Sequence, residues 1–299
     1  PMSRSELCFC DRRLHLDKKS DIMGILNVTP DSFSDGGKFL RYEDALERAR
    51  EMVQQGADII DIGGESSRPF SEPVSADEEL DRVLPVIRAL AGNIDVPVSI
   101  DTTKAEVARR AVAAGAEIIN DISAMRFDPD MAKVAADTGA GLVLMHMKGT
   151  PKSMQKNPVY DDLIGEIRAF LMDAVGRAEA AGVKANRIVI DPGVGFGKTV
   201  AHNLEILHQL NRFDDIGPPL LLGVSRKAFI RKILGQTKGA EPAPDDPDIE
   251  NATQAAVAIG IFNGAGIVRV HNVSRARAAV RIADAICRSV VSPAGEENQ

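Results

Sequence analysis

Eight short apolar runs that alternate with helical segments predict an α/β fold, a single-domain (β/α)8 barrel of the TIM-barrel type. The runs are rich in Ile, Val and Leu, show no polar alternation, and each ends in a polar residue. Such continuous runs are typical of parallel strands that are buried on both faces. No compositional break divides the 299 residues, so one closed barrel fits better than two domains. A doubly wound open sheet is the runner-up, and it would need fewer strands.

The predicted strands end on polar residues that a barrel would gather at one rim, where the active sites of such barrels lie. The strands are expected at residues 22–27, 59–61, 96–101, 118–121, 141–146, 188–191, 220–225 and 267–271. We assign the barrel to residues 21–288, an N-terminal extension to residues 1–20 and a flexible C-terminal tail to residues 289–299.

Local signals mark the helices between the strands. Capping boxes are predicted at two helix starts, where Ser75 precedes Glu78 and Thr103 precedes Glu106. A glycine followed by a small residue precedes four of the strands, as expected for a helix C-cap, at Gly56, Gly115, Gly139 and Gly264. The proline-rich stretch 235–248 is predicted to be a long flexible loop after the seventh strand's helix.

Composition excludes several function classes. The net charge is −7, and 10 Phe, 2 Tyr and no Trp leave neither a basic patch nor a stacking platform, so no nucleic-acid partner is expected. No membrane partner is expected either, because no long apolar run is present and the first 20 residues lack a signal-peptide pattern. Three cysteines without paired spacing favour a reducing compartment, and we predict a cytoplasmic location.

The polar residues at the strand ends suggest the chemistry of the rim. Cations from distant parts of the chain, Arg68, Lys227 and Arg269, imply an anionic ligand. The glycine-rich stretch 191–199 fits neither a Walker A loop nor a dinucleotide fingerprint, because its glycines are wrongly spaced. We interpret it as a surface where backbone approaches a flat ligand and Phe196 covers that ligand. The five histidines show no zinc-ligand spacing.

Seven motifs in order give the chain a strong resemblance to the dihydropteroate synthase family, which makes a folate precursor. The motifs lie at residues 24–37 (GILNVTPDSFSDGG), 63–69 (GGESSRP), 99–102 (SIDT), 120–122 (NDI), 191–193 (DPG), 225–227 (SRK) and 269–271 (RVH). The resemblance covers about residues 21–286. It implies a transferase that joins 6-hydroxymethyl-7,8-dihydropterin diphosphate to p-aminobenzoate and releases diphosphate.

The resemblance also implies roles for individual residues. The pterin would lie among Asp101, Asn120, Asp191, Lys227 and Met145. Diphosphate would be bound by Asn27 through Mg²⁺, which is the expected cofactor, and by Arg68, Arg269 and His271. The p-aminobenzoate pocket would be lined by Phe33, Ser67, Pro69, Phe196 and Lys227. Catalysis would fall to Asp101, Lys227 and Arg269, without a covalent nucleophile and by a dissociative route.

The resemblance implies in addition a homodimer and two loops, 28–39 and 66–74, that close over the site with Gly36 and Gly37 as a hinge. Three positions depart from the family pattern: Ser67 replaces a usual Thr, Phe70 replaces a usual Gly, and Ala228 replaces the usual Ser after the lysine. Loss of that hydroxyl removes one expected contact to the p-aminobenzoate carboxylate, so the sequence gives no prediction of sulfonamide sensitivity.

Two rival functions remain. A methyltetrahydrofolate-type pterin methyltransferase would share the pterin contacts but would not need cations for diphosphate. A non-catalytic pterin-binding paralogue would be expected to have lost Asn27, Arg68 or Lys227, all of which are present. The first-loop motif together with Lys227, Arg269 and His271 favours the synthase.

Overall fold

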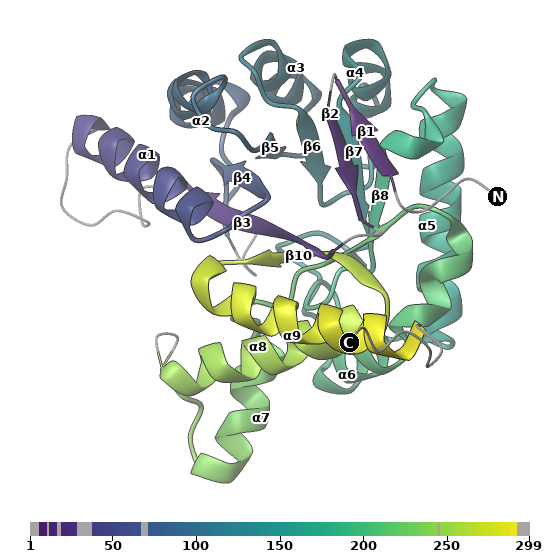
Figure 1. Cartoon of the computed structure of the whole chain (residues 1–299). Helices are drawn as coiled ribbons and strands as arrows, with labels where there is room; N and C mark the ends of the chain where they lie inside the picture. Colours follow the sequence, from purple (N-terminus) through teal and green to yellow (C-terminus); the bar gives the residue numbers. More distant parts are fainter. Residues whose placement is uncertain are drawn as a thin grey trace, which may run out of the picture.

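Eight parallel strands close into a barrel in this computed structural model (Figure 1). Going round the barrel, each strand pairs with its neighbours in the chain, and β10 closes the ring against β3. A closed ring excludes the open-sheet alternative and confirms the predicted TIM barrel. The strands are β3 (Asp21–Asn27), β4 (Ile59–Gly63), β5 (Val98–Asp101), β6 (Ile118–Asp121), β7 (Gly141–Met145), β8 (Ile188–Asp191), β9 (Leu220–Leu222) and β10 (Ala265–Val270).

Helices pack around the outside of the barrel (Figure 1). The structure describes residues 6–10, 12–16, 19–28, 38–66, 71–243 and 246–291. Within them the helices are α1 (Lys38–Gln54), α2 (Ala76–Leu90), α3 (Ala105–Ala113), α4 (Met131–Thr138), α5 (Leu163–Ala180), α6 (Val200–His208), α7 (Ala228–Lys238), α8 (Pro247–Phe262) and α9 (Val273–Val291), with short 3-10 turns at Ala185–Arg187 and Leu210–Ile216. None of these helices is long and apolar enough to cross a membrane.

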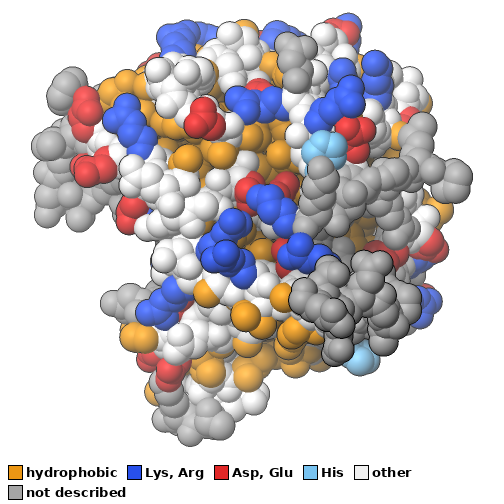
Figure 2. Space-filling view, in the orientation of Figure 1, with side chains coloured by type: hydrophobic (Ala, Val, Ile, Leu, Met, Phe, Trp, Pro, Cys, Tyr) orange, Lys and Arg blue, Asp and Glu red, His pale blue; other side chains and the backbone are white. Residues whose placement is uncertain are grey.

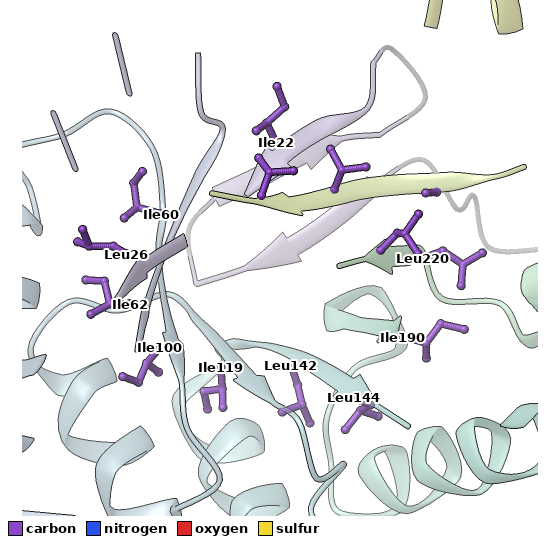
Figure 3. Close-up of a cluster of buried hydrophobic side chains, with 14 of the residues drawn as sticks. Ile22, Leu26, Ile60, Ile62, Ile100, Ile119, Leu142, Leu144, Ile190 and Leu220 are labelled. Atoms are coloured by element: carbon purple, nitrogen blue, oxygen red, sulfur yellow. The ribbon is translucent and has the colours of Figure 1, made fainter. Parts of the chain in front are cut away.

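Successive strand residues point alternately to the helices and to the barrel interior. Outward residues such as Ile60, Ile100 and Ile119 belong to the large cluster shared with the helices (Figure 3). Their inward neighbours near the amino ends of the strands form a separate cluster that contains Ile59 and Ile118. By the same alternation, Asp61, Asp101 and Asn120 also point into the barrel, two residues closer to the carboxyl ends of their strands. An otherwise apolar strand therefore places a polar side chain at the mouth of the barrel.

The predicted N-terminal extension forms a hairpin that closes the amino end of the barrel. Strand β1 (Glu6–Phe9) pairs antiparallel with β2 (Arg12–His15). Leu7 and Phe9 are buried in the inward cluster of the barrel, and the Cys10 amide donates to the Gly139 carbonyl at 3.0 Å. In the described part of the chain, apolar side chains thus close this end, and the barrel interior opens toward the carboxyl ends of the strands.

The helix boundaries follow most of the predicted signals. Ser75 caps α2 by accepting from the Glu78 amide, as predicted. The prediction for Thr103 is wrong, because α3 begins two residues later and its first amide, at Ala105, donates to Asp128 instead. Gly139 ends α4 with φ at +74°, as expected for a C-cap glycine.

Two predicted boundaries also move. The predicted loop 235–248 is shorter, since α7 continues to Lys238 and α8 begins at Pro247. Asp246 caps α8 by accepting from the Asp248 amide, and the proline takes the first helical position, where no amide hydrogen is needed. At the C-terminus, α9 continues to Val291, past the predicted barrel boundary at 288.

Candidate active site

Four side chains from four strands meet inside the mouth of the barrel. The Arg269 guanidinium of β10 donates from Nε to Asp61 Oδ2 of β4 at 2.7 Å and from Nη2 to Asp101 Oδ2 of β5 at 2.7 Å. Asn120 of β6 donates from Nδ2 to the same Asp61 oxygen at 3.0 Å. The register supports this convergence, because Asp101 pairs with Asn120 across β5 and β6. We call Asp61, Asp101, Asn120 and Arg269 the inner network.

Asp61 is the member of the inner network that the sequence-based site assignment missed. Its side chain is fully buried, it accepts from both Arg269 and Asn120, and its Oδ1 has no hydrogen-bond partner in the described structure. The available signal was its place at the end of an apolar strand. The resemblance assigned no ligand contact to Asp61, and its hydrogen bonds to Arg269 and Asn120 could not be predicted from the sequence.

Burial shifts the pKa values of the ionisable groups at the mouth. Desolvation raises the pKa of Asp101 to about 7, although Arg269 lowers it, and Asp61 adds to the rise. Burial likewise raises the pKa of Asp191 to about 6 against the stabilising Gly193 amide. Desolvation lowers the pKa of Lys227 to about 8, and Asp191 partly offsets that fall. Such opposed shifts among groups that share a cleft are typical of functional sites.

The Lys227 side chain lies between the inner network and the glycine-rich loop 193–197. Its Nζ lies 3.9 Å from the centre of the Phe196 ring, which is a cation–π contact. Lys227 follows Arg226, whose backbone has φ at +57°, a strained value for a residue other than glycine. Thr253 of α8 accepts from the Arg226 amide at 3.2 Å, and Glu250 accepts from its side chain at 3.3 Å. Helix α8 therefore supports the turn that presents Lys227.

The glycines of the loop 193–197 approach neighbouring chain segments very closely. A side-chain carbon built at Gly193 would lie 1.8 Å from the His146 carbonyl oxygen, and one built at Gly197 would lie 2.6 Å from the Lys148 carbonyl oxygen. A carbon at Gly195 would lie 2.9 Å from Lys227 Cδ. The close approach inferred from the sequence is therefore real, but in the structure the partners are the end of β7 and Lys227.

The remaining predicted residues lie around the same mouth. Met145, at the end of β7, is buried in a small cluster with Phe196 and Ile122. His271 follows β10, and its Nδ1 lies 2.9 Å from Ser225 Oγ. Asp191 accepts from the Gly193 amide at 2.7 Å. The structure thus brings all five predicted pterin residues to one end of the barrel.

Asn27 ends β3 beside the inner network and has the chemistry of a magnesium ligand. Its Oδ1 and Asp101 Oδ2 both lie within 3.8 Å of the place where a side chain on Gly63 would begin. Oxygen atoms of amides and carboxylates are the ligands that Mg²⁺ prefers. The described residues contain no cluster of three or more His, Cys, Asp or Glu that could hold a metal.

Two cavities lie at opposite ends of the barrel. A cavity of about 260 Å³ opens at the carboxyl end beside Asp101, Lys104 and Phe127. A larger one, of about 780 Å³, lies at the amino end between the hairpin and α9. Its wall mixes basic and acidic side chains, and Figure 2 shows Lys and Arg beside carboxylates near the middle of the face in view. We assign the active site to the smaller cavity's end, because the inner network lies there.

Several predicted residues cannot be placed. Phe33, Ser67, Arg68, Pro69 and Phe70 lie outside the described residues, as do Gly36 and Gly37 of the predicted hinge. Of the second predicted loop, Ser66 and residues 71–74 are described. Glu65 receives a hydrogen bond from the Val74 amide at 3.2 Å, and it also pairs with Lys104. The Glu65 side chain, which directly precedes this loop, therefore bonds to the last residue of the loop and to Lys104.

Comparison with known proteins agrees with this geometry. A family described as pterin binding enzyme matches residues 23–271. The dihydropteroate synthase of Synechocystis sp. is 48% identical over 271 residues, covering 91% of each chain. That of Bacillus subtilis is 46% identical over 275 residues, covering 91% of this chain and 90% of the relative.

Solved structures of similar proteins extend the comparison. Dihydropteroate synthase from Xanthomonas albilineans, solved with 4-aminobenzoic acid, superposes with a TM-score of 0.86 at 40% identity, covering 97% of this chain and 99% of the other. The same enzyme in complex with 7,8-dihydropteroate gives a TM-score of 0.83 at 39% identity, covering 96% and 100%.

Proposed function

This chain belongs to the pterin-binding enzyme family and is a dihydropteroate synthase, and we propose that the inner network and Lys227 carry out its reaction by a dissociative route. The reaction joins 6-hydroxymethyl-7,8-dihydropterin diphosphate to p-aminobenzoate and yields 7,8-dihydropteroate and diphosphate. The observation that carries the assignment of roles is the convergence of two buried carboxylates, Asp61 and Asp101, with Asn120 and Arg269 at the barrel mouth.

The pterin ring would lie among Asp101, Asn120, Asp191 and Lys227, with Met145 against its face. A pterin presents ring N–H groups and an exocyclic amine, which a carboxylate such as Asp191 can accept together. A hydrogen bond to a charged group contributes about 1.5 to 3 kcal/mol. Asp191 is nearly buried, and the Gly193 amide fixes one of its oxygens, so its orientation is set before the ring arrives.

In the proposed first step, the bond between the pterin methylene carbon and the bridging oxygen breaks, and diphosphate leaves with the electron pair. Arg269, Arg68 and His271 would hold the charge that develops on the departing group, which accelerates the step more than equal binding of the ground state. Asp101 would stabilise the pterin cation. The aniline nitrogen of p-aminobenzoate then attacks the methylene carbon and releases one proton.

We propose Mg²⁺ as the cofactor, bound by Asn27. Bound there with substrate oxygens, the ion would supply Lewis-acid stabilisation of the diphosphate. The chain's own contribution is to orient the amide: Asn27 ends β3 opposite Gly63 of β4, where the absence of a side chain leaves room beside Asp101.

The p-aminobenzoate would lie between Phe196 and Lys227 on one side and Phe33, Ser67 and Pro69 on the other. The Phe196 ring and the Lys227 ammonium already contact each other, and together they offer an apolar face and a cation to an aromatic carboxylate. Ala228 begins α7 directly after Lys227, so its methyl group adds no hydrogen bond there.

The proposal is tested by the release of diphosphate from the dihydropterin substrate. We expect release that depends on both p-aminobenzoate and Mg²⁺ and that matches dihydropteroate formed mole for mole. A pterin methyltransferase would release no diphosphate, and a non-catalytic paralogue would bind pterin without turnover. Either result would exclude the synthase reaction for this chain.

Lys227→Ala tests the part of the mechanism that depends on charge. We expect kcat to fall by about 100-fold or more, in line with the loss of one fixed electrostatic contact in an active site. The thermal unfolding midpoint should change little, because burial of this amine is itself unfavourable. Lys232→Ala on the exposed face of the same helix is the matched control and should keep normal turnover. Normal rates in Lys227→Ala would remove this residue from the mechanism.

We also propose that the enzyme is a homodimer formed through α6 and α8. Ile259 and Phe262 of α8 are 52% and 62% exposed, and Leu204 of the adjacent α6 is 46% exposed. Large apolar side chains gathered on neighbouring helices favour burial against a second copy. Sedimentation should give the mass of two chains, and the double variant Ile259→Lys and Phe262→Lys should sediment as a monomer. A wild-type monomer would refute the dimer.

The cellular location stays a prediction. Cys8, Cys10 and Cys287 all lie within the described residues, and no disulfide joins them. This fits the reducing compartment that the cysteine spacing favours, and we propose the cytoplasm.

A further inference from the structure

Lys198 is a buried amine to which no part of the proposed mechanism gives a role. It follows the glycine-rich loop 193–197, and only 3% of its surface is exposed. Its Nζ lies 3.0 Å from His146 Nδ1, 2.8 Å from the Gly193 carbonyl oxygen and 3.0 Å from the Phe196 carbonyl oxygen. The amine donates to the two carbonyl oxygens and lies within hydrogen-bond distance of the His146 ring nitrogen, and all three of these partners are neutral groups.

The two carbonyl contacts hold the turn that carries Phe196. The Phe196 amide donates to the Gly193 carbonyl oxygen at 3.1 Å, which closes a tight turn. Lys198 donates to the carbonyl oxygens at both ends of the same turn. The amine thus holds the backbone at both ends of the turn that carries Phe196.

Other side chains fasten the rest of the loop. Gln155 donates to the Gly195 carbonyl oxygen at 2.7 Å, Tyr160 donates to that of Gly197 at 2.8 Å, and Asn203 accepts from the Gly195 amide at 2.7 Å. These contacts lie between Gly195 and Gly197 and leave the carbonyl of Phe196 to Lys198. Lys198 is therefore the side chain that ties Phe196 itself.

Burying a lysine in this space costs free energy, because its amine loses its contact with water. Burial lowers the pKa of Lys198 well below its usual range, and the nearby Lys227 adds to that fall, although Asp191 opposes it. Burial and the neighbouring Lys198 lower the pKa of His146 to about 2. Its ring is therefore neutral and can accept at Nδ1. A methionine would fill a similar volume without desolvating an amine. The choice of lysine indicates a requirement for its donors.

We propose that Lys198 is a positioning residue for p-aminobenzoate: by holding the Gly193–Phe196 turn, it keeps the Phe196 ring against Lys227. The inference rests on the proposed function, which puts p-aminobenzoate against the face that this ring and Lys227 form together. Asp191 and the inner network do not hydrogen-bond to Lys198 in the described structure. Lys198 acts on Asp191 through the Gly193 segment and through its charge, so the pterin side of the site should depend on it less than the p-aminobenzoate side.

Lys198→Met is the principal test, measured by steady-state kinetics with each substrate varied. We expect the KM for p-aminobenzoate to rise about tenfold or more, while the KM for the pterin diphosphate and kcat stay within about threefold, which is the pattern of a lost binding contact. Lys198→Gln keeps a shorter donor and should give an intermediate KM. Lys184→Met, on an exposed lysine away from the loop, is the matched control and should behave as wild type.

Hydrogen exchange on the same variants separates the inference from the proposed function. In Lys198→Met, the amides of residues 193–197 should exchange faster, while those of β5 and β6 should not change, whether or not the chain makes dihydropteroate. Unchanged exchange in the loop would overturn the positioning role. A uniform loss of kcat, of both affinities and of thermal stability would also overturn it, since it would indicate general structural damage. An inactive wild type with the expected exchange pattern would refute only the proposed function.

Discussion

At the scale of single residues, the direction of a side chain from its strand decides its task. Asn120 and Asp121 are neighbours at the end of β6. Asn120 points into the barrel and donates to Asp61, whereas Asp121 is buried outside the inner network. Asp121 accepts from the Ser123 amide, the Ser123 hydroxyl and the Met125 amide, and so shapes the loop after β6. Two adjacent polar residues therefore do separate work, one at the site and one beneath a loop.

Asp61→Asn should show what the inner network contributes to turnover. The substitution removes the charge that holds Arg269, and a charged hydrogen bond of this kind contributes about 1.5 to 3 kcal/mol. We expect kcat/KM for the pterin diphosphate to fall about 10- to 100-fold.

Ser99→Ala is the matched control for Asp61→Asn. Ser99 is also fully buried, and its hydroxyl has no hydrogen-bond partner in the described structure. Its loss should leave kcat/KM within about twofold, because no hydrogen bond is broken. Equal kinetics in the two variants would show that the Asp61 contacts to Arg269 and Asn120 have no catalytic consequence.

At the scale of elements, the loop after β8 is shaped by how little space its neighbours leave. Gly193 has φ at +69°, and a side chain there would collide with the His146 carbonyl at the end of β7. The loop can therefore lie flat across the adjacent strand end and bring Phe196 to Lys227. Close packing against the neighbouring strand end thus accounts for the glycines of this loop without a phosphate ligand. This agrees with the sequence, whose glycine spacing does not fit a Walker A loop.

Gly193→Ala should be strongly destabilising, both because its φ is positive and because the added carbon would collide with a neighbour. Gly92→Ala separates these two causes. Gly92 has φ at +72°, close to that of Gly193, but nothing lies within 4 Å of the added carbon. Gly92→Ala should cost about 1 to 2 kcal/mol of unfolding free energy from backbone strain alone. Gly193→Ala adds a steric overlap and should cost about 4 kcal/mol or more. Equal losses in urea unfolding would refute the steric argument.

At the scale of the whole molecule, the barrel has one plugged end and one reactive end. The hairpin β1–β2 and the inward apolar cluster occupy the amino end, and ion pairs surround them. Asp21 begins β3 there, is 2% exposed, and pairs with Lys19 at 3.2 Å. The opposite end gathers the ionisable groups of the site. We therefore expect the polar groups at the amino end to affect stability rather than turnover.

Asp21→Asn should reveal a pH-dependent stability term from the amino end. Burial, together with Asp58, raises the pKa of Asp21 to about 6 from 3.8, although Lys19 opposes the shift. Between these two pH values the folded chain binds the proton more tightly than the unfolded chain does, so this group's contribution falls as the pH rises. The unfolding free energy of the variant relative to wild type should therefore increase by up to about 3 kcal/mol from pH 4 to pH 7.

The exposed Asp95→Asn at the same end of the barrel is the control for this pH series. Its difference from wild type in urea unfolding should stay constant over the same pH range. A constant difference for Asp21→Asn as well would show that the burial of this carboxyl has no effect on stability.

Sequence patterns were sufficient to predict the barrel, its eight strands and the family. Apolar runs that end in polar residues are a local signal, and the motifs are short enough to lie within single loops. The predicted pterin residues Asp101, Asn120 and Asp191 lie at or next to the ends of strands, and the family resemblance supplied their roles.

Which of these residues support one another depends on contacts that form only in the folded chain. Asp61 lies 208 positions from Arg269 in the chain, and Lys198 lies 52 positions from His146. Their contacts depend on closure of the ring and on loop packing across neighbouring strand ends. The wrong cap at Thr103 has the same origin, because α3 begins only at Ala105, whose amide donates to Asp128 on the following loop. Local patterns fix elements, while long-range packing fixes the partners of buried polar groups.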